Sequence, residues 1–204
     1  MARAAQSAGV RAAAVRDRRS ASDRRRAPRP AGQGTLVSVD GLSAAAIKQA
    51  ARRLATADKK MRAGISWWDA SGIFGDVDAA PPDAEQPSIR TLLLLYAADL
   101  SFRLRWEIGP ALAEGRTVIA APYVDTAIAL GRAAGVDESW LRTMFNFAPA
   151  AKERRYVETV RSAKNEVGLL EFTCKRAAGL STKAAREELL TRMRARLKAG
   201  RARA

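Results

Sequence analysis

The alternation of apolar and polar positions predicts that regular structure begins with a strand at residues 35–39. This short run is rich in β-branched residues and ends at Asp40-Gly41, as strands that enter a turn commonly do. The alanine-rich stretch 43–55 then predicts a helix. The order strand, turn, helix is typical of the first unit of an α/β fold.

Three later segments predict further strands. Residues 65–68 form a short apolar and aromatic run. Residues 117–121 are apolar and β-branched, and the run is short enough to be a buried strand of a parallel sheet. Residues 155–160 predict a weaker strand, which is too polar for the centre of the sheet.

The longest helical pattern extends from Ser88 to Glu114. Ser88 is a suitable N-cap, Gly115 is a suitable C-terminal stop, and Pro110 is predicted to kink the last turn. Apolar residues recur at helical spacing through this stretch, at Leu93, Tyr96, Ala97, Leu100, Leu104 and Ile108.

Three more helices are predicted after the strand at 117–121. They cover residues 124–134, residues 137–147 with Asp137 as N-cap, and an amphipathic stretch that Ser181 caps. Strands that alternate with helices in this way predict an α/β fold of three layers, in which helices cover both faces of a parallel sheet.

Composition divides the chain into a domain at residues 34–199 and two basic tails, residues 1–33 and 200–204. Residues 1–33 carry nine arginines against two aspartates, which gives +7 of the net charge of +15, and almost no large apolar side chains. Such a segment cannot bury enough surface to offset the entropy of ordering it, which predicts a disordered tail. An unconstrained extension is favoured; a mitochondrial transit peptide and an arm that binds nucleic acid nonspecifically are the alternatives.

The inventory of side chains excludes several kinds of site. The chain has no histidine, and Cys174 is its single cysteine, so neither an internal disulfide nor a zinc site is expected. Any proton transfer would fall to Asp, Glu, Lys or Tyr. No apolar run approaches the ~20 residues of a membrane span, which predicts a soluble, cytoplasmic protein without a membrane partner.

Four stretches resemble the thymidylate kinase family of P-loop kinases. The run LLLLYAADL at 92–100 resembles the family's helix that faces the thymine base, and IGPALAEGRTVIAAPYVDTAIA at 108–129 resembles the segment around its Asp-Arg-Tyr triplet. AAGVDESWLRTMFNFAP at 133–149 and EFTCKRAAGLS at 171–181 resemble the following helix and the lid region. The resemblance implies a P-loop kinase-like fold over residues 34–198. ATP and Mg²⁺ as cofactors are implied by the family alone.

The phosphate-binding positions depart from the family's pattern. A working loop has the form G-x-x-x-x-G-K-[ST], in which backbone N–H groups wrap a phosphate, the lysine neutralises it and the hydroxyl holds Mg²⁺. Gly41 matches the first glycine, whereas Ala46, Ile47 and Lys48 stand where the second glycine, the lysine and the hydroxyl belong. Ile47 offers no charge. Lys48 cannot take the place of the family's lysine, because successive residues of a helix point about 100° apart.

At other positions of the family's nucleotide site, some residues are replaced in this chain and others match. Ala121-Pro122 replaces the family's Asp-Arg pair, and Leu100 replaces its thymine-facing arginine. The matching residues predict a nucleotide-binding site that has no catalytic residue and no metal ligand: Asp40, Gly41, Tyr96, Tyr123, Asp125 and Thr126. Tyr96 is expected to stack on the base, with core packing as the alternative. Capping a helix is the alternative for Asp40 and Asp125.

These observations predict a catalytically impaired thymidylate kinase-like protein that binds a nucleoside monophosphate or regulates a partner. The long middle helix, with Phe102 and Trp106, is expected to form a homo- or heterodimer. One alternative is an active monophosphate kinase with a rearranged phosphate site, whose charge comes from Lys48, Arg103, Arg105, Lys175 and Arg176. The other is a protein that binds nucleic acid nonspecifically through its basic tails.

Overall fold

The computed structural model describes residues 34–57, 63–81, 84–157, 167–180 and 182–201. Three predictions lie outside the described residues: the tail at 1–33, the capping role of Ser181 and the end of the strand at 155–160.

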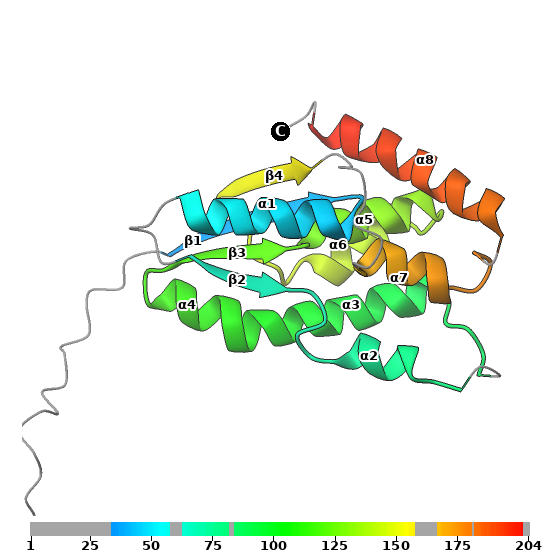
Figure 1. Ribbon diagram of the computed structural model, residues 1–204, viewed down its shortest axis with the longest axis horizontal. Coiled ribbons are helices and arrows are strands. Elements are labelled where there is room, and N and C mark those ends of the chain that lie inside the picture. The colour runs from blue at the N-terminus through cyan, green and yellow to red at the C-terminus, as the bar shows by residue number, and fades with distance from the viewer. Residues whose placement is uncertain (1–33, 58–62, 82–83, 158–166, 181, 202–204) are drawn as a thin grey trace, which may run out of the picture.

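A four-stranded parallel sheet forms the centre of the structure (Figure 1). Its order is β2-β3-β1-β4, with the bounds β1 Thr35–Gly41, β2 Gly64–Trp67, β3 Thr117–Ala121 and β4 Glu153–Val157. Val37 of β1 lies opposite Ile119 of β3, so the predicted strands at 35–39 and 117–121 are confirmed as parallel neighbours. The chain crosses to one side of β1 for β2 and β3 and to the other for β4, which places a topological switch point at the carboxyl ends of β1 and β3.

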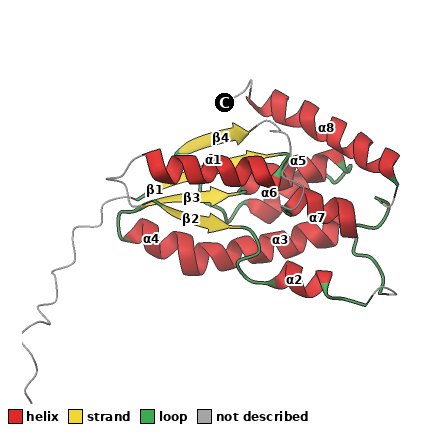
Figure 2. Ribbon diagram, in the orientation of Figure 1, coloured by secondary structure: helices red, strands yellow, loops and turns green. Residues whose placement is uncertain are grey.

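Helices lie on both faces of this sheet, as Figure 2 shows, and they confirm the predicted three-layer, P-loop kinase-like fold. On one face Ile47 of the helix at 44–57 packs with Val39 and Ile119 in an apolar cluster. On the opposite face Leu36 and Val118 belong to a larger cluster, to which five of the helices contribute leucines: Leu92, Leu130, Leu141, Leu169 and Leu189. Successive strand residues therefore supply both layers of the core, and residues 36–41 of β1 and 118–121 of β3 are buried on both faces of the sheet.

The helices have the bounds α1 Ala44–Ala57, α2 Ile73–Asp78, α3 Ile89–Arg103, α4 Gly109–Ala113, α5 Val124–Ala133, α6 Glu138–Phe145, α7 Leu169–Arg176 and α8 Lys183–Arg201, with a π-helical turn, η1 Leu104–Ile108, between α3 and α4. Two predicted caps are confirmed. The Ser88 hydroxyl accepts from the Thr91 N–H at 3.0 Å, and the Asp137 carboxylate accepts from the Trp140 N–H at 2.8 Å. No described helix is both long and apolar enough to cross a membrane.

The long predicted helix is continuous but changes pitch just before Pro110. At the end of η1 the N–H of Gly109 donates to the carbonyl of Leu104, five residues back. Pro110 has no N–H to offer the carbonyl of Trp106, and a wider π-helical turn accommodates that loss. A local widening is therefore found where a kink in the last turn was predicted.

Candidate functional site

The connection between β1 and α1 is a tight turn in place of a phosphate-binding loop. Leu42 and Ser43 alone separate the end of β1 at Gly41 from the first residue of α1. The N–H of Ile47 donates to the carbonyl of Ser43 at 2.9 Å, which closes the first helical turn. Backbone that would wrap a phosphate is therefore wound into a helix, and only N–H groups of its first turn are left to meet an anion.

An internal carboxylate occupies the N-terminus of α1. Glu171 of α7 accepts a hydrogen bond from the N–H of Ala44 at 2.9 Å. A helix N-terminus carries partial positive charge and favours an anion, which this carboxylate supplies. The side chain of Ala44 also abuts α7, because a Cβ added to Gly168 would lie 2.8 Å from the Cβ of Ala44. Side chains of α1 and α7 and the backbone of Gly168 thus meet closely at the N-terminus of α1.

A cavity of about 380 Å³ lies beside this contact, at the carboxyl ends of β1, β2 and β3. Trp67 and Trp68 form part of its wall, while Lys48, Arg52 and Glu171 supply charged groups. Its volume falls within the ~300–1,000 Å³ that is usual for small-molecule sites. Its position at the switch point is the one at which open α/β sheets bind their ligands.

Asp40 ties the first strand to the start of α5. Its Oδ1 accepts hydrogen bonds from the N–H groups of Tyr123 and Thr126, both at 3.0 Å, and from the Thr126 hydroxyl at 2.8 Å. The N–H of Gly41 donates to the same hydroxyl at 3.1 Å. Oδ2 of Asp40 is buried and has no hydrogen-bond partner in the described structure. Burial, and then the charge of Asp125, raise the pKa of Asp40 to about 6.

Tyr96 lies in the core and does not line the cavity. Its side chain is fully buried and packs edge-to-face with Phe145. Its hydroxyl donates to the backbone carbonyls of Pro122 and Tyr123, at 3.0 and 2.6 Å. A base could stack on this ring only after these contacts had broken, so the packing supports the core alternative for Tyr96.

The side chains of Tyr123 and Asp125 join α5 to other elements. The Tyr123 hydroxyl donates to the carbonyl of Pro149 at 2.7 Å. Asp125 accepts from the Tyr156 hydroxyl of β4 at 2.6 Å and lies 3.7 Å from the guanidinium of Arg154. Burial and the hydrogen bond to Asp125 raise the pKa of Tyr156, so this phenol stays protonated and donates. Both side chains therefore have structural contacts away from the cavity wall.

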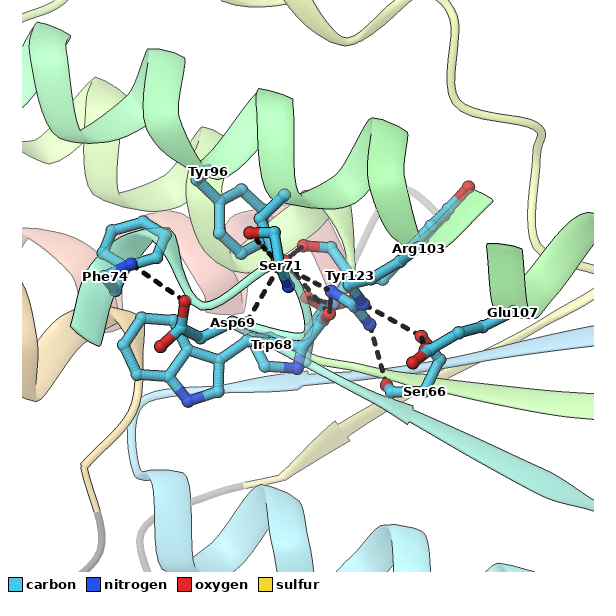
Figure 3. A network of polar contacts seen from close by, with 12 residues as sticks. Ser66, Trp68, Asp69, Ser71, Phe74, Tyr96, Arg103, Glu107 and Tyr123 are labelled. Carbon is cyan, nitrogen blue, oxygen red and sulfur yellow. Dashed lines mark hydrogen bonds and ion pairs between the residues drawn. The ribbon is translucent and has the colours of Figure 1, made fainter. Parts of the chain in front are cut away.

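A second polar cluster, built on Asp99 and Arg103 of α3, lies at the end of β2, and Figure 3 shows its residues Arg103, Ser66 and Glu107. Arg103 is fully buried and donates to the hydroxyl of Ser66 at 2.9 Å, to its carbonyl at 2.8 Å and to the carbonyl of Pro122 at 3.0 Å. The Ser66 hydroxyl donates in turn to Glu107 at 2.6 Å. Asp99, also fully buried, lies 4.0 Å from the Arg103 guanidinium. This cluster fixes the ends of β2 and β3 relative to α3.

Asp99 also holds the turn that follows β2. Its carboxylate accepts from the N–H of Asp69 at 3.0 Å, from the N–H of Ser71 at 3.0 Å and from the Ser71 hydroxyl at 2.9 Å. Asp69, which has a left-handed φ of 57°, accepts from the N–H of Phe74 at 2.9 Å and so starts α2. The carboxylates of Asp99 and Asp69 therefore shape the turn between β2 and α2.

Three aromatic rings connect this turn to α7. The ring centroids of Trp68 and Phe74 lie 4.8 Å apart, and Phe172 of α7 lies 5.1 Å from Phe74. The Trp68 indole N–H donates to the carbonyl of Val167 at 3.2 Å. These contacts dock α7 against the end of β2, and they place Glu171 at the N-terminus of α1.

The structure brings part of the predicted nucleotide site together. Gly41 and Thr126 line the cavity, and Asp40 lies behind them, hydrogen-bonded to Thr126. The other three predicted residues do not line it: Tyr96, Tyr123 and Asp125.

Sequence reasoning missed Asp99 and Glu171 as residues that shape the site, and it considered Arg103 only as a charge for a rearranged phosphate site. Asp99 and Arg103 are four positions apart on a largely apolar helix, a spacing that signals an ion pair. Glu171 is separated from Ala44 by 127 positions, so no local pattern could have shown their contact.

The charges that a rearranged phosphate site requires do not converge. Of the five cations considered for it, Lys48 alone lines the cavity. Arg103 is used by the cluster at the end of β2, while Lys175 and Arg176 lie 2.8 and 3.9 Å from Asp78. Within the described ranges, no group of three or more Cys, Asp or Glu side chains is placed to hold a metal ion.

Comparisons with protein-family models and with curated proteins identify no match to this chain. The geometry of the site is therefore the basis for assigning a function.

Proposed function

We propose that this chain is a thymidylate kinase-like protein that binds a ligand and a partner without transferring phosphoryl groups. The observation that carries the proposal is the Glu171 carboxylate at the N-terminus of α1. Catalysis of phosphoryl transfer consists almost entirely of positioning the phosphates and stabilising their charge. A carboxylate at this position repels a phosphate and takes the Ala44 N–H that a phosphate would use.

Ile47 supports the same conclusion. It stands where the family has its phosphate lysine, and its side chain is buried with Val39 and Ile119 against the sheet. Removing one donor to developing charge typically costs ~10²–10³ in rate. The lysine, the metal-binding hydroxyl and the Asp-Arg pair are all replaced here, and although such losses are not additive, little transfer is expected to survive them.

A nucleoside monophosphate is the ligand proposed for the cavity at the carboxyl ends of the strands. Trp67 and Trp68 offer flat apolar surface to a base, and Lys48 and Arg52 offer positive charge to a single phosphate. Stacking of a base on an aromatic side chain contributes ~1–3 kcal/mol. Binding is therefore expected to be weak, with a Kd on the order of 10⁻⁴–10⁻³ M, and independent of Mg²⁺.

Isothermal titration of the full chain with thymidine monophosphate, and separately with ATP–Mg²⁺, tests this assignment. Weak monophosphate binding and no heat from ATP–Mg²⁺ are expected. Trp67→Ala should abolish the monophosphate signal, whereas Trp106→Ala, which removes an exposed indole on η1, should preserve it. ATP–Mg²⁺ binding that is tighter than monophosphate binding would contradict the proposal.

A second copy of the chain is the partner that we propose for the long helix. Leu94, Phe102 and Trp106 are 52%, 39% and 65% exposed, and they account for three of the five large exposed apolar side chains in the described part of the chain. Positions separated by multiples of four form a stripe along one side of a helix. An isologous pairing of two such stripes would cover both at once.

A further inference from the structure

The C-terminal helix α8 attaches to the domain through a narrow apolar contact. Leu189 and Met193 are 4% and 0% exposed, and they belong to the core cluster that includes Leu130 of α5. Figure 1 shows that α8 lies along α5, at the end of the molecule opposite to α4. Five of the seven side chains at residues 190–196 are exposed, so the charges of this stretch decide what it can bind.

A cavity of about 510 Å³ lies between α8 and the end of α5. Half of its lining residues are arginines, and the other half are small; they are Arg132, Ala133, Gly135, Arg192, Ala195 and Arg196. The small residues leave the surface concave, and three guanidinium groups surround it. This site has the shape and charge to receive an anion.

The positive charge of this surface exceeds its negative charge. Arg132 lies 2.6 Å from Glu138, but Glu138 also pairs with Arg142. Arg192 pairs with Glu188, and Arg196 has no acidic partner among the described residues. After Glu188 the sequence contains no acidic residue and six cations, at Arg192, Arg194, Arg196, Lys198, Arg201 and Arg203. The guanidinium Nε of Arg132 is buried without an acceptor in the described structure, so the protein leaves this donor unsatisfied.

We propose that this arginine surface, consisting of Arg132, Arg192 and Arg196, binds the phosphate backbone of nucleic acid. A guanidinium group donates two parallel hydrogen bonds that fit the oxygens of a phosphate. Several arginines side by side bind a chain of phosphates more tightly than one does. Arg192 and Arg196 are one helical turn apart, so both can meet one backbone. The arginines bind the nucleic acid through its phosphate charge, without preference for base sequence.

A membrane surface fits this helix less well than nucleic acid does. Interfacial helices insert an exposed apolar face beneath their cations. The large exposed apolar side chains among the described residues are Leu94, Phe102, Trp106, Phe147 and Val167, and none of them lies on α8. The apolar face of α8 is instead used against α5.

The test uses the full chain, a short fluorescein-labelled DNA duplex of arbitrary sequence, and fluorescence anisotropy at several salt concentrations. Arg192→Gln with Arg196→Gln should weaken binding about tenfold or more near ~0.1 M salt and lower the slope of log K against log[salt] by about 2. The matched control, Arg105→Gln with Arg116→Gln, removes the same charge from exposed positions on η1 and beside α4. It should change binding by about twofold or less. The basic tail at residues 1–33 is present in every variant, so differences between variants report the arginine surface.

Three further results decide the proposal. A second variant, Arg196→Gln alone, keeps the contact of Arg192 with the carbonyl of Ala133 and should also weaken binding, which excludes a folding defect. Equal loss in the arginine-surface variants and in the control would overturn the proposal, as would failure of the unaltered chain to bind the duplex. Displacement of the duplex by tripolyphosphate at equal phosphate concentration, or stronger binding to anionic vesicles than to the duplex, would also overturn it.

Discussion

The Glu171 carboxylate accepts a hydrogen bond from the N–H of Ala44 at 2.9 Å. A side chain of α7 therefore caps the N-terminus of α1, the first helix after β1. In a P-loop kinase the corresponding helix N-terminus is kept open for phosphate. Here the partial positive charge of α1 is already matched by a side chain that the fold holds in place through the aromatic contacts of Trp68, Phe74 and Phe172. The same contact therefore caps α1 and leaves a carboxylate where an external anion would otherwise meet the helix N-terminus.

Removing this carboxylate should destabilise the protein and expose an anion site. For Glu171→Ala we expect a loss of about 1 kcal/mol in the free energy of unfolding, the typical effect of losing a side-chain cap. Sulfate should recover part of this loss, because an anion can replace the carboxylate at the helix N-terminus. Urea denaturation in sulfate and in chloride at matched ionic strength measures both effects.

Sulfate stabilises folded proteins in general, so this comparison needs a control. Glu187→Ala removes an exposed carboxylate of α8 that lies 3.8 Å from Lys183. It should show only the general sulfate effect. An equal sulfate response in the two variants would mean that the α1 N-terminus does not accept an anion.

The buried Arg103 is expected to be important for stability. Arg103→Met leaves Asp99 buried without its positive partner and removes three hydrogen bonds to Ser66 and Pro122. Breaking a buried ion pair by removing one partner typically costs ~3–5 kcal/mol, and we expect a loss of that size in urea denaturation. Arg116→Met, which breaks an exposed pair with Glu114, should cost less than about 1 kcal/mol. Similar losses in the two variants would contradict the structural role of the cluster.

Asp40 should make stability fall as pH rises from about 4 to about 6. Burial raises the pKa of this carboxyl from 3.8 to about 6 in the folded protein. Between these values the folded state binds more protons than the unfolded state, so the free energy of unfolding decreases with rising pH, by up to about 3 kcal/mol. Asp40→Asn should remove this part of the pH dependence, measured by urea denaturation across the window.

The exposed carboxyl of Glu114 provides a control for that experiment. Glu114→Gln should keep the wild-type pH dependence, because its side chain is 63% exposed. If the Asp40→Asn variant also retains the full slope between pH 4 and 6, another group is responsible for it.

Self-association should depend on the apolar stripe of α3 and η1. Trp106→Lys places a charge at a position that is 65% exposed in the described structure. We expect sedimentation equilibrium to show a dimer for the unaltered chain and a monomer for this variant, with little change in stability. Phe147→Lys, at another exposed apolar position, should remain dimeric. Dimerisation that survives in Trp106→Lys would place the interface elsewhere.

Local sequence rules were sufficient for much of the fold. The cap at Ser88 depends on a residue type and a spacing that can be read from a few neighbouring positions, and it is present as predicted. Pairing of the strands at 35–39 and 117–121 follows from their apolar, β-branched character, because such short runs need burial on both faces. The π-helical turn could not be predicted, since Pro110 signals only that a hydrogen bond is missing and not how the backbone adapts.

The site was less predictable because it depends on contacts between distant segments. A single residue type at Tyr96 is compatible with base stacking and with core packing, and only the position of Phe145 and the backbone around Tyr123 separates the two. The replacement of the phosphate lysine by Ile47 was visible in the sequence. The carboxylate that caps the N-terminus of α1 comes from Glu171, and the docking of α7 that brings it there leaves no local signal.

A coupled assay for transfer of phosphate from ATP–Mg²⁺ to thymidine monophosphate tests the central claim most directly. We expect no transfer above the uncatalysed background by the full chain, because Glu171 caps the N-terminus of α1 and Ile47 is buried in the core. Turnover in the usual enzyme range of ~1–10³ s⁻¹ that disappears in Lys48→Ala would contradict it, and would instead establish an active kinase with a rearranged phosphate site.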